Sequence, residues 1–488
     1  MDLRQSYDDV TYESLPFPQS HPDRLFVVSN LLGFTPAPVQ TARVLELGCA
    51  TGANLLAMAD VLPDAHFLGI DLSPKQIEIG NQFVRSLNLL NIQFQAIDLQ
   101  HLAADAGQFD YIIAHGLYSW VPDDVRRRLM QLIKQHLSPT GVAYISYNTF
   151  PGWRIKQISR EIMLYHTRHI TDPRQRLTAA QQFLSQVAGA LPTESSAYAR
   201  ALHDEANFLA QQQPYYLAHD HLESINHPVY FHQFVENAAQ HGLQYIAEAT
   251  LSSMTGLELP AATQEALRRL PIKDPIEAQQ YLDFLAHRSF RQSIVTHAGA
   301  KILATPDPAL IKDFYISANI KLPPDFDISS SAPSTLKVFN GIEFDIAEPL
   351  YKALFAELAE GFPLHLHFDD LIARAQQRVP VAAPGLAEEQ IKGITAFLLQ
   401  CYLHQIIDLY PRQPDFITTV SDRPTARPLA RAQAQHSNRV VNYLHQSVNL
   451  DEAARQFLLQ LDGREWSTPD AAAASALKQL AAASLFCA

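Results

Sequence analysis

Cysteine is scarce in this chain, whose 488 residues include only Cys49, Cys401 and Cys487. The three lie far apart and form no CxxC pair, so the pattern excludes a disulfide framework and a four-cysteine zinc site. Sparse, unpaired cysteines are typical of a reducing compartment. We therefore expect a cytoplasmic protein.

Long apolar runs and an excess of basic residues are also lacking. No stretch approaches the ~20 uninterrupted apolar residues of a membrane-spanning helix, and the polar, acidic N-terminal segment does not resemble a signal peptide. The 37 Lys and Arg residues are outnumbered by 50 Asp and Glu residues, for a formal net charge of −13. Nucleic-acid binders normally carry a basic face, so we expect no nucleic-acid partner. An acidic surface suits a basic substrate, such as a lysine-bearing protein.

The chain also lacks the residue spacings that are typical of metal-binding motifs. Twenty histidines are present, but His219, His221, His227 and His232 follow neither the HExxH pattern nor a Cys/His zinc pattern. We interpret them as structural histidines and expect no metal site.

Five short apolar segments early in the chain predict β-strands, with room for helices between most of them. This alternation predicts an α/β fold with a parallel sheet and right-handed crossovers. After the second segment, Ser73 and Pro74 have the residue types of a helix N-cap and a first helical position. Residues beyond about 150 have mainly helical patterns, interrupted by a proline- and serine-rich loop at 322–335. The predicted strands are residues 43–47, 66–70, 92–97, 109–114 and 142–146.

The strongest chemical signal directly follows the first predicted strand, where Glu46, Gly48, Gly52 and Asn54 stand close together. Glycine at 48 permits a tight turn, and glycine at 52 lets a helix N-terminus approach a ligand. Such turns occur in both dinucleotide and S-adenosylmethionine sites. The GxxxG spacing and the preceding carboxylate favour the second, because a carboxylate suits a cationic cofactor and would be an odd neighbour for a pyrophosphate.

Acidic residues also end the second and third predicted strands. Asp71 is placed to accept hydrogen bonds from both ribose hydroxyls, and Asp98 is placed to accept one from the adenine amine. The adjacent Leu72 and Leu99 belong to the same predicted cofactor site. Each acid also has a structural interpretation, as a helix cap for Asp71 and as a solvated loop residue for Asp98.

Aromatic and polar residues gather where the fourth and fifth strands end, which is where ligands bind in such sheets. His115, Tyr118 and Trp120 follow the fourth strand, and Tyr147 and Asn148 end the fifth. We predict that these residues line the transfer site. His115 is the leading candidate for a general base and is also a predicted cofactor contact. The alternative for the three aromatic residues is packing at a domain junction or in the core.

The Glu46-x-Gly48-x-x-x-Gly52 motif, with Asp71 and Asp98, resembles that of class I S-adenosylmethionine-dependent methyltransferases. Ala50, inside the motif, departs from many relatives, which have glycine there.

Further segments resemble a narrower bacterial family that carries a methyltransferase regulatory domain and includes the rickettsial lysine methyltransferases of outer-membrane proteins. Residues 7–25 resemble its N-terminal signature. Residues 216–222 and 226–231 resemble the start of the regulatory domain, and residues 289–292 resemble its end. The likeness is looser beyond residue 300.

This resemblance implies a Rossmann-like, seven-stranded methyltransferase domain followed by mainly helical domains. The expected ranges are 1–200 for the S-adenosylmethionine-binding domain with its lid, 201–300 for the regulatory domain and 301–488 for the C-terminal domain. The implied activity is methyl transfer from S-adenosylmethionine to protein lysines by in-line displacement. A small-molecule N- or O-methyltransferase and a non-catalytic cofactor-binding regulator are the alternatives. No oligomeric state follows from the sequence.

The segment before the first strand is predicted to fold over the cofactor as a lid that excludes water. Its predicted cofactor contacts are Tyr7, Tyr12, Phe17 and His21. The alternative is a surface strap that only stabilises the domain.

Overall fold

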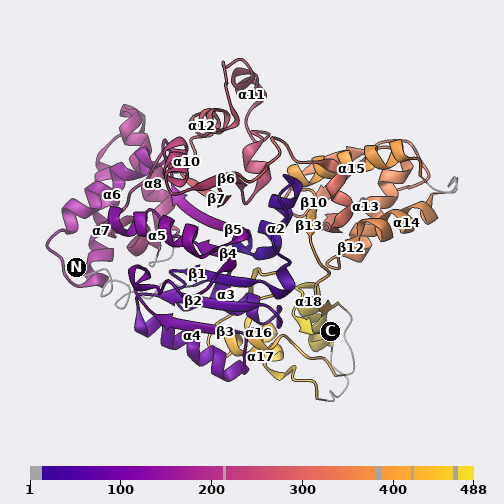
Figure 1. Cartoon of the computed structure of the whole chain (residues 1–488), viewed down its shortest axis with the longest axis horizontal. Helices are drawn as coiled ribbons and strands as arrows, with labels where there is room; N and C mark the ends of the chain where they lie inside the picture. Colours follow the sequence, from indigo (N-terminus) through magenta and orange to yellow (C-terminus); the bar gives the residue numbers. More distant parts are fainter. Residues whose placement is uncertain (1–13, 213–215, 380–385, 419–422, 465–470, 488) are drawn as a thin grey trace.

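The computed structural model describes residues 14–212, 216–379, 386–418, 423–464 and 471–487. Its centre is a seven-stranded sheet with the order β3-β2-β1-β4-β5-β7-β6 (Figure 1). Strands β1 to β5 are parallel, and β7 is antiparallel to both of its neighbours. The predicted Rossmann-like, seven-stranded α/β fold is thereby confirmed. The strands are β1 (Arg43–Leu47), β2 (His66–Asp71), β3 (Ile92–Ala96), β4 (Phe109–Ala114), β5 (Leu137–Asn148), β6 (Leu243–Glu248) and β7 (Phe290–His297).

All five predicted strands are present, because each is a short apolar run between turns. The bounds of β1 and β4 agree with the prediction, whereas β5 begins earlier, at Leu137, which pairs with Phe109. The helix after β2 also begins as predicted. Ser73 Oγ accepts a hydrogen bond from the Gln76 backbone, and Pro74 is the first helical residue.

Side chains along the central strands point alternately to the two faces of the sheet, and each face has its own hydrophobic core. Val44 and Ile113 pack in the core formed with α2 and α3, whereas Leu45 and Ile112 pack with α5 and α10. All four side chains are fully buried, so each strand contributes apolar surface to both faces. The helices around the sheet are α2 (Pro22–Leu31), α3 (Ala53–Ala59), α4 (Pro74–Leu87), α5 (Asp123–His136), α10 (Phe231–Gln240), α11 (Ala261–Arg268) and α12 (Pro275–Ala286).

The last two strands come from the range that was expected to form a separate domain. β7 pairs with β5 from Ala143↔Val295 to Asn148↔Phe290, and β6 pairs with β7. Arg291 of β7 is fully buried, with ion pairs of 2.7 Å to Glu248 and 2.8 Å to Asp283. Residues 201–300 do contain the expected helices. The expected boundary at residue 200 stays a prediction, and the structure shows in addition that this range supplies the last two strands of the central sheet.

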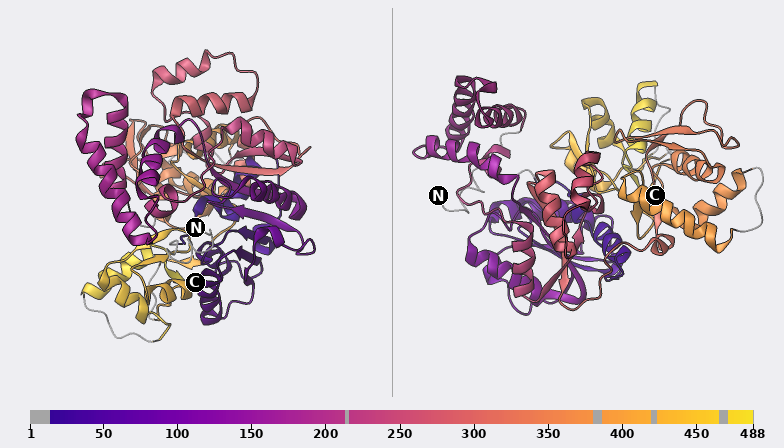
Figure 2. Two further views of the ribbon diagram at one scale, coloured as in Figure 1. Left: turned by 90° about the vertical axis from the view of Figure 1, so that its left-hand side faces the viewer. Right: turned by 90° about the horizontal axis from the view of Figure 1, so that it is seen from above.

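A group of three helices lies between β5 and β6 in the sequence. They pack on one another around a small core that includes Met163, Leu184 and Leu202. Figures 1 and 2 show this group projecting from one side of the molecule, with the residues after 300 at the other side. A π-helical turn, Leu217–His221, then leads the chain back towards the sheet. The helices are α6 (Trp153–Thr167), α7 (Pro173–Ala190) and α8 (Ala197–Ala210).

The described residues after 300 combine the expected helices with short strands in four small sheets. The strands are β8 (Tyr315–Ser317), β9 (Ile320–Lys321), β10 (Ser334–Val338), β11 (Glu343–Ile346), β12 (Leu366–His367), β13 (Asp408–Tyr410), β14 (Phe416–Ile417), β15 (Arg439–Val441), β16 (Ser447–Asn449) and β17 (Phe486–Cys487). The helices are α13 (Pro349–Gly361), α14 (Phe368–Arg378), α15 (Glu388–Leu403), α16 (Pro428–Ala434), α17 (Glu452–Gln460) and α18 (Ala471–Ala482).

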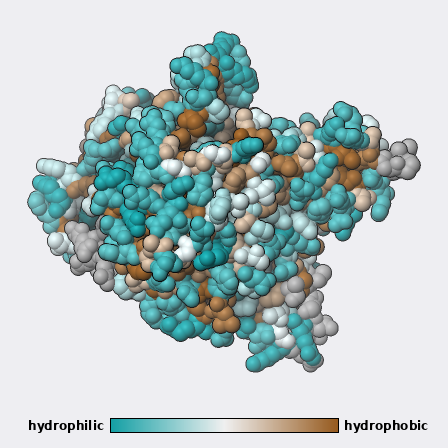
Figure 3. All heavy atoms as spheres, viewed as in Figure 1, coloured by the Kyte–Doolittle hydropathy of each residue, from teal (hydrophilic) through white to brown (hydrophobic). Residues whose placement is uncertain are grey.

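Hydrophilic residues prevail on the face drawn in Figure 3, and the hydrophobic ones form separate patches. Among the described residues, no helix combines the length and the apolar composition that crossing a bilayer requires.

Candidate active site

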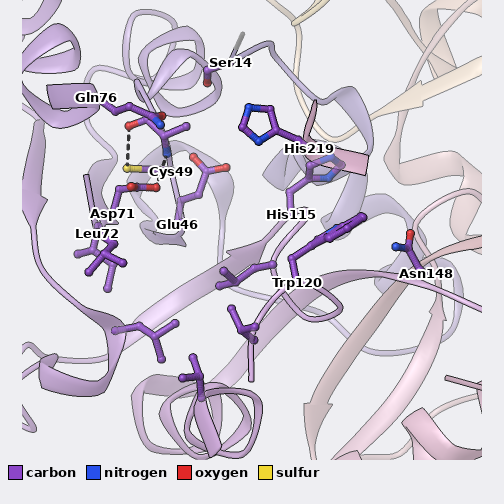
Figure 4. A pocket seen from close by; sticks show the side chains of 18 of the residues that line it. Ser14, Glu46, Cys49, Asp71, Leu72, Gln76, His115, Trp120, Asn148 and His219 are labelled. Carbon is purple, nitrogen blue, oxygen red and sulfur yellow. Dashed lines mark hydrogen bonds between the residues drawn. The ribbon is translucent and has the colours of Figure 1, made fainter. Parts of the chain in front are cut away.

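A cavity of about 700 Å³ opens at the carboxyl ends of the parallel strands (Figure 4). One part of its wall comes from the turns after β1, β2 and β3. Another part comes from the segments after β4 and β5 and from residues 201–300, the expected regulatory domain, which is called the regulatory range below. The predicted residues that line it are Phe17, Glu46, Gly48, Asn54, Asp71, Leu72, Asp98, Leu99, His115, Trp120 and Asn148.

The turn after β1 is held in left-handed backbone conformations. Gly48, Ala50 and Gly52 have φ of 75°, 50° and 76°. Such values favour glycine, so Ala50 stores strain here. A Cβ at Gly52 would collide with the ring of Phe94, and Gly52 does not line the cavity. Its predicted role in approaching the ligand is therefore corrected to close packing against β3.

Glu46 and Asn54 form the buried floor of this turn. Asn54 Nδ2 donates to Glu46 Oε1 at 2.8 Å. Among the described residues, the other carboxylate oxygen, Oε2, is buried without a hydrogen-bond partner. Burial raises the pKa of Glu46 to about 8, the bond from Asn54 opposes that rise, and the nearby Asp71 adds to it. A cation beside Oε2 would satisfy this oxygen.

The acids that end β2 and β3 organise their own loops. Asp71 accepts backbone hydrogen bonds from Ala50 at Oδ2 and from Ser73 at Oδ1, both at 2.9 Å. Asp98 Oδ1 accepts from the Gln100 backbone at 2.8 Å. The structural alternatives differ in detail from what is found, because Ser73 and not Asp71 is the N-cap of α4, and Asp98 is half-buried and caps the 3-10 helix Leu99–His101. Both acids remain compatible with ligand binding, because each carboxylate oxygen has two lone pairs and both residues line the cavity.

A hydrogen-bonded chain holds His115 at the end of β4. Gln292 Nε2 donates to Tyr144 Oη at 2.9 Å, and Tyr144 Oη lies 2.9 Å from His115 Nδ1. Burial lowers the pKa of His115 to about 3 and raises that of Tyr144. Both groups are therefore neutral, and the tautomer of the imidazole decides which of them donates in the bond between them. With its lowered pKa, His115 is a weak proton acceptor, which argues against the predicted role of general base.

The N-terminal segment covers this histidine. The ring of Phe17 stacks on that of His115 with centroids 3.6 Å apart, and the Phe17 backbone N–H donates to Asn54 Oδ1 at 2.9 Å. Phe17 therefore bridges Asn54 on α3 and His115 after β4 at the wall of the cavity. Of the other predicted lid residues, Tyr7 and Tyr12 lie outside the described residues.

The remaining wall was largely missed by sequence reasoning. Trp153 and Lys156 lie on the first turn of α6, and Tyr216, His219 and Asp220 lie on or beside the π-helical turn. Burial raises the pKa of Asp220 to about 6, opposed by the charges of Lys156 and His219. The aromatic and histidine-rich character of residues 216–221 was the signal that could have found them. Ser289 and Phe290, at the start of β7, complete this side.

Aromatic rings frame this part of the cavity. Trp120 and Trp153 meet edge to face with centroids 6.1 Å apart, and Lys156 Nζ lies 5.7 Å from the Trp153 ring centroid. A cation is thus already accommodated against an aromatic face here.

Comparison with known proteins identifies the fold and its ligand. A methyltransferase domain model matches residues 44–141, a predicted methyltransferase regulatory domain matches 213–297, and the C-terminal winged helix domain of PKMT matches 422–482. The uncharacterized protein RP789 of Rickettsia prowazekii is 33% identical over 467 residues, which cover 94% of this chain and 83% of that protein. The structure of PKMT2 from Rickettsia typhi in complex with AdoHcy superposes with a TM-score of 0.85 at 25% identity, covering 97% of this chain and 99% of that one. The chain belongs to this family of class I methyltransferases.

The cofactor of this methyltransferase is S-adenosylmethionine, and the chemistry of the cavity fits it. The unsatisfied Glu46 Oε2 is a buried acceptor suited to a cationic group. The backbone turn beside it is one that admits a ligand close to the main chain.

Two predicted catalytic residues of the methyltransferase lie behind the cavity. Tyr118 Oη accepts from Asn237 Nδ2 at 2.7 Å, and Tyr147 Oη bonds with Ser293 Oγ at 3.1 Å. Both rings pack against Phe234 and are 1% exposed. Successive strand side chains point to opposite faces, so Asn148 reaches the cavity and Tyr147 does not. The prediction that Tyr118 and Tyr147 line the transfer site is wrong.

His21 is also outside the cavity. Its Nδ1 accepts from the Asp23 backbone at 3.1 Å and so caps α2, and its ring packs 4.9 Å from that of His445. Of the predicted lid contacts within the described residues, the structure places Phe17 at the cavity and His21 in the packing behind it.

Proposed function

We propose that this methyltransferase transfers the methyl group to lysine side chains of a protein. The observation that carries the proposal is the second part of the cavity wall, which is lined by one half-buried carboxylate, Asp220, together with the aromatic residues Trp120, Trp153 and Tyr216. A carboxylate beside aromatic faces suits an incoming ammonium group better than a neutral or anionic acceptor. The similarity to a structure named PKMT2 supports the same assignment.

We assign the cofactor to the first part of the wall. We expect the Glu46 carboxylate to bind the amino group of the cofactor, Asp71 to bind its ribose hydroxyls and Asp98 to bind its adenine amine. We expect the stacked rings of His115 and Phe17 to cover the reacting end of the cofactor. When bound, S-adenosylmethionine would supply an electrophilic methyl group, whose carbon would form a bond to the amine nitrogen as its bond to sulfur breaks in line, leaving S-adenosylhomocysteine.

We expect residues in the second part of the wall to prepare the acceptor's lysine amine for attack. A lysine ammonium must lose a proton before its nitrogen can attack. Asp220 is a stronger proton acceptor than an ordinary carboxylate, because burial raises its pKa to about 6. Lys156 acts in the same direction, since a neighbouring positive charge lowers the pKa of an incoming ammonium.

The acceptor class can be tested with cofactor carrying a labelled methyl group. We expect label in the protein fraction of a cell lysate, at lysine residues identified by mass spectrometry. Acetylating the lysines of the acceptor beforehand should abolish transfer, and raising the ionic strength should reduce it, because the charge of −13 favours basic polypeptides. Label found only in low-molecular-weight compounds would establish a small-molecule methyltransferase instead.

A further inference from the structure

The C-terminal region reaches the cofactor end of the cavity through a hairpin. Strands β15 and β16 pair antiparallel, and the turn between them includes His445, with φ of 58°. His445 is 5% exposed and contacts Asn54, which lies 391 residues earlier in the chain. Figure 1 shows this region (yellow) beside α3, and α16 packs against α4.

The contact completes the hydrogen bonding of the Asn54 amide. Oδ1 accepts from the Phe17 backbone at 2.9 Å and bonds with His445 Nε2 at 2.8 Å. Nδ2 donates to Glu46 Oε1 at 2.8 Å and to Ser20 Oγ at 3.0 Å. A backbone N–H can only donate, so the bond from Phe17 fixes which end of the amide is oxygen, and His445 must donate from Nε2. All four hydrogen-bonding positions of this amide are thus used.

The histidine is held rigidly in its neutral form. Burial lowers its pKa well below the usual value, and the charges of His21 and Arg427 lower it further. Arg427 anchors the same turn to α3, because its fully buried guanidinium bonds with the Asn442 carbonyl, the Ala57 carbonyl and Asp60. The guanidinium of Arg427 therefore holds the turn that carries His445 against α3, close to Asn54.

We propose that His445 is a positioning residue of the cofactor site. Its bond to Oδ1 holds the Asn54 amide in the orientation that aims Nδ2 at Glu46, while the same oxygen holds the Phe17 backbone over the cavity. Without this donor, the amide keeps one of its two acceptor bonds and can turn away from Glu46. The C-terminal region thereby sets the affinity for the cofactor, independently of which acceptor is methylated.

The test compares full-length variants by calorimetric titration with S-adenosylhomocysteine and by steady-state kinetics. For His445→Gln we expect nearly normal affinity, because the amide Nε2–H can replace the imidazole donor. For His445→Leu we expect the Kd and the KM for S-adenosylmethionine to rise about tenfold, with kcat at saturating cofactor within about twofold of the wild type. The matched control is His436→Leu, an exposed histidine of the same region, which should change neither.

The comparison remains decisive if His445→Leu does not fold. His445→Asn carries the same amide as His445→Gln but is one methylene shorter, so it should lose affinity where the glutamine variant retains it. Equal Kd values for His445→Gln and His445→Asn, or a folded His445→Leu variant with wild-type affinity, would overturn the proposal.

Discussion

The two parts of the cavity wall are built in different ways. The cofactor part comes from consecutive strand-to-helix turns, so Glu46, Asp71 and Asp98 are brought together by the regular geometry of a parallel sheet. The opposite part comes from the start of α6, a π-helical turn and the start of β7. The first part follows the regular geometry of the sheet, and the second part follows no such regular pattern. Residues of the regulatory domain thus line the same cavity as the predicted cofactor residues.

The largest expected effect tests whether the regulatory range is inseparable from the sheet. Arg291→Met removes the partner that the buried Glu248 and Asp283 share. Arg288 still pairs with Asp283 at 3.1 Å, so the cost falls mainly on Glu248, and breaking such a buried pair costs about 3–5 kcal/mol. We expect one cooperative unfolding transition at lower denaturant concentration, with cofactor binding lost in the same transition. Arg268→Met, whose side chain is 67% exposed in the wild type, is the control. Two separate transitions, with cofactor binding retained after the first, would show that residues 201–300 fold on their own.

The next effect concerns the floor of the cofactor part. Glu46→Gln keeps the size of the side chain but removes the charge facing a cationic amino group. We expect the Kd for S-adenosylmethionine to rise by about tenfold to a hundredfold, corresponding to roughly 1–3 kcal/mol. Calorimetry checks the affinity, with the exposed Glu78→Gln variant as control. Unchanged affinity in Glu46→Gln would remove this residue from the cofactor site.

The same residue predicts how cofactor binding depends on pH. Because the pKa of Glu46 is raised to about 8 in the free protein, its carboxyl group is mostly protonated at pH 7. A bound ammonium group favours the carboxylate, so binding should release a proton at pH 7 and strengthen as pH rises towards 8, by at most about tenfold per pH unit. Titrations in buffers with different ionisation enthalpies measure this release. A release of the same size in Glu46→Gln would assign the proton to another group.

Most residues of the first part of the wall could be found from the sequence, because their signals are local. Each acid follows an apolar strand directly, and the glycines lie within one turn. Strands β6 and β7 were not predicted, since they join β5 only after more than ninety intervening residues. The face on which Tyr147 points depends on the register of that strand, and the bond between His445 and Asn54 spans 391 residues. Neither leaves a pattern in the local sequence.

A smaller effect is expected behind His115, where the two parts of the wall meet. Tyr144→Phe removes the hydroxyl that bonds with His115 Nδ1 and so releases the imidazole from this contact. We expect kcat to fall by about threefold to tenfold without loss of thermal stability, measured against Tyr165→Phe, a residue 68% exposed. A kcat equal to that of the wild type would mean that this bond to His115 does not matter for transfer.

The division of the cavity into a cofactor part and an acceptor part is tested most directly by Asp220→Asn, with two measurements on one preparation. The first is the Kd for S-adenosylhomocysteine by calorimetry, and the second is kcat/KM for methyl transfer to a lysine-rich protein. We expect a Kd within about twofold of the wild type and a kcat/KM lowered at least about tenfold. The wild type should show a fall in kcat/KM as pH drops through about 6, where Asp220 gains its proton, and the variant should lose this fall. A variant whose cofactor affinity falls as much as its kcat/KM, or one that methylates lysines as fast as the wild type, would contradict the account.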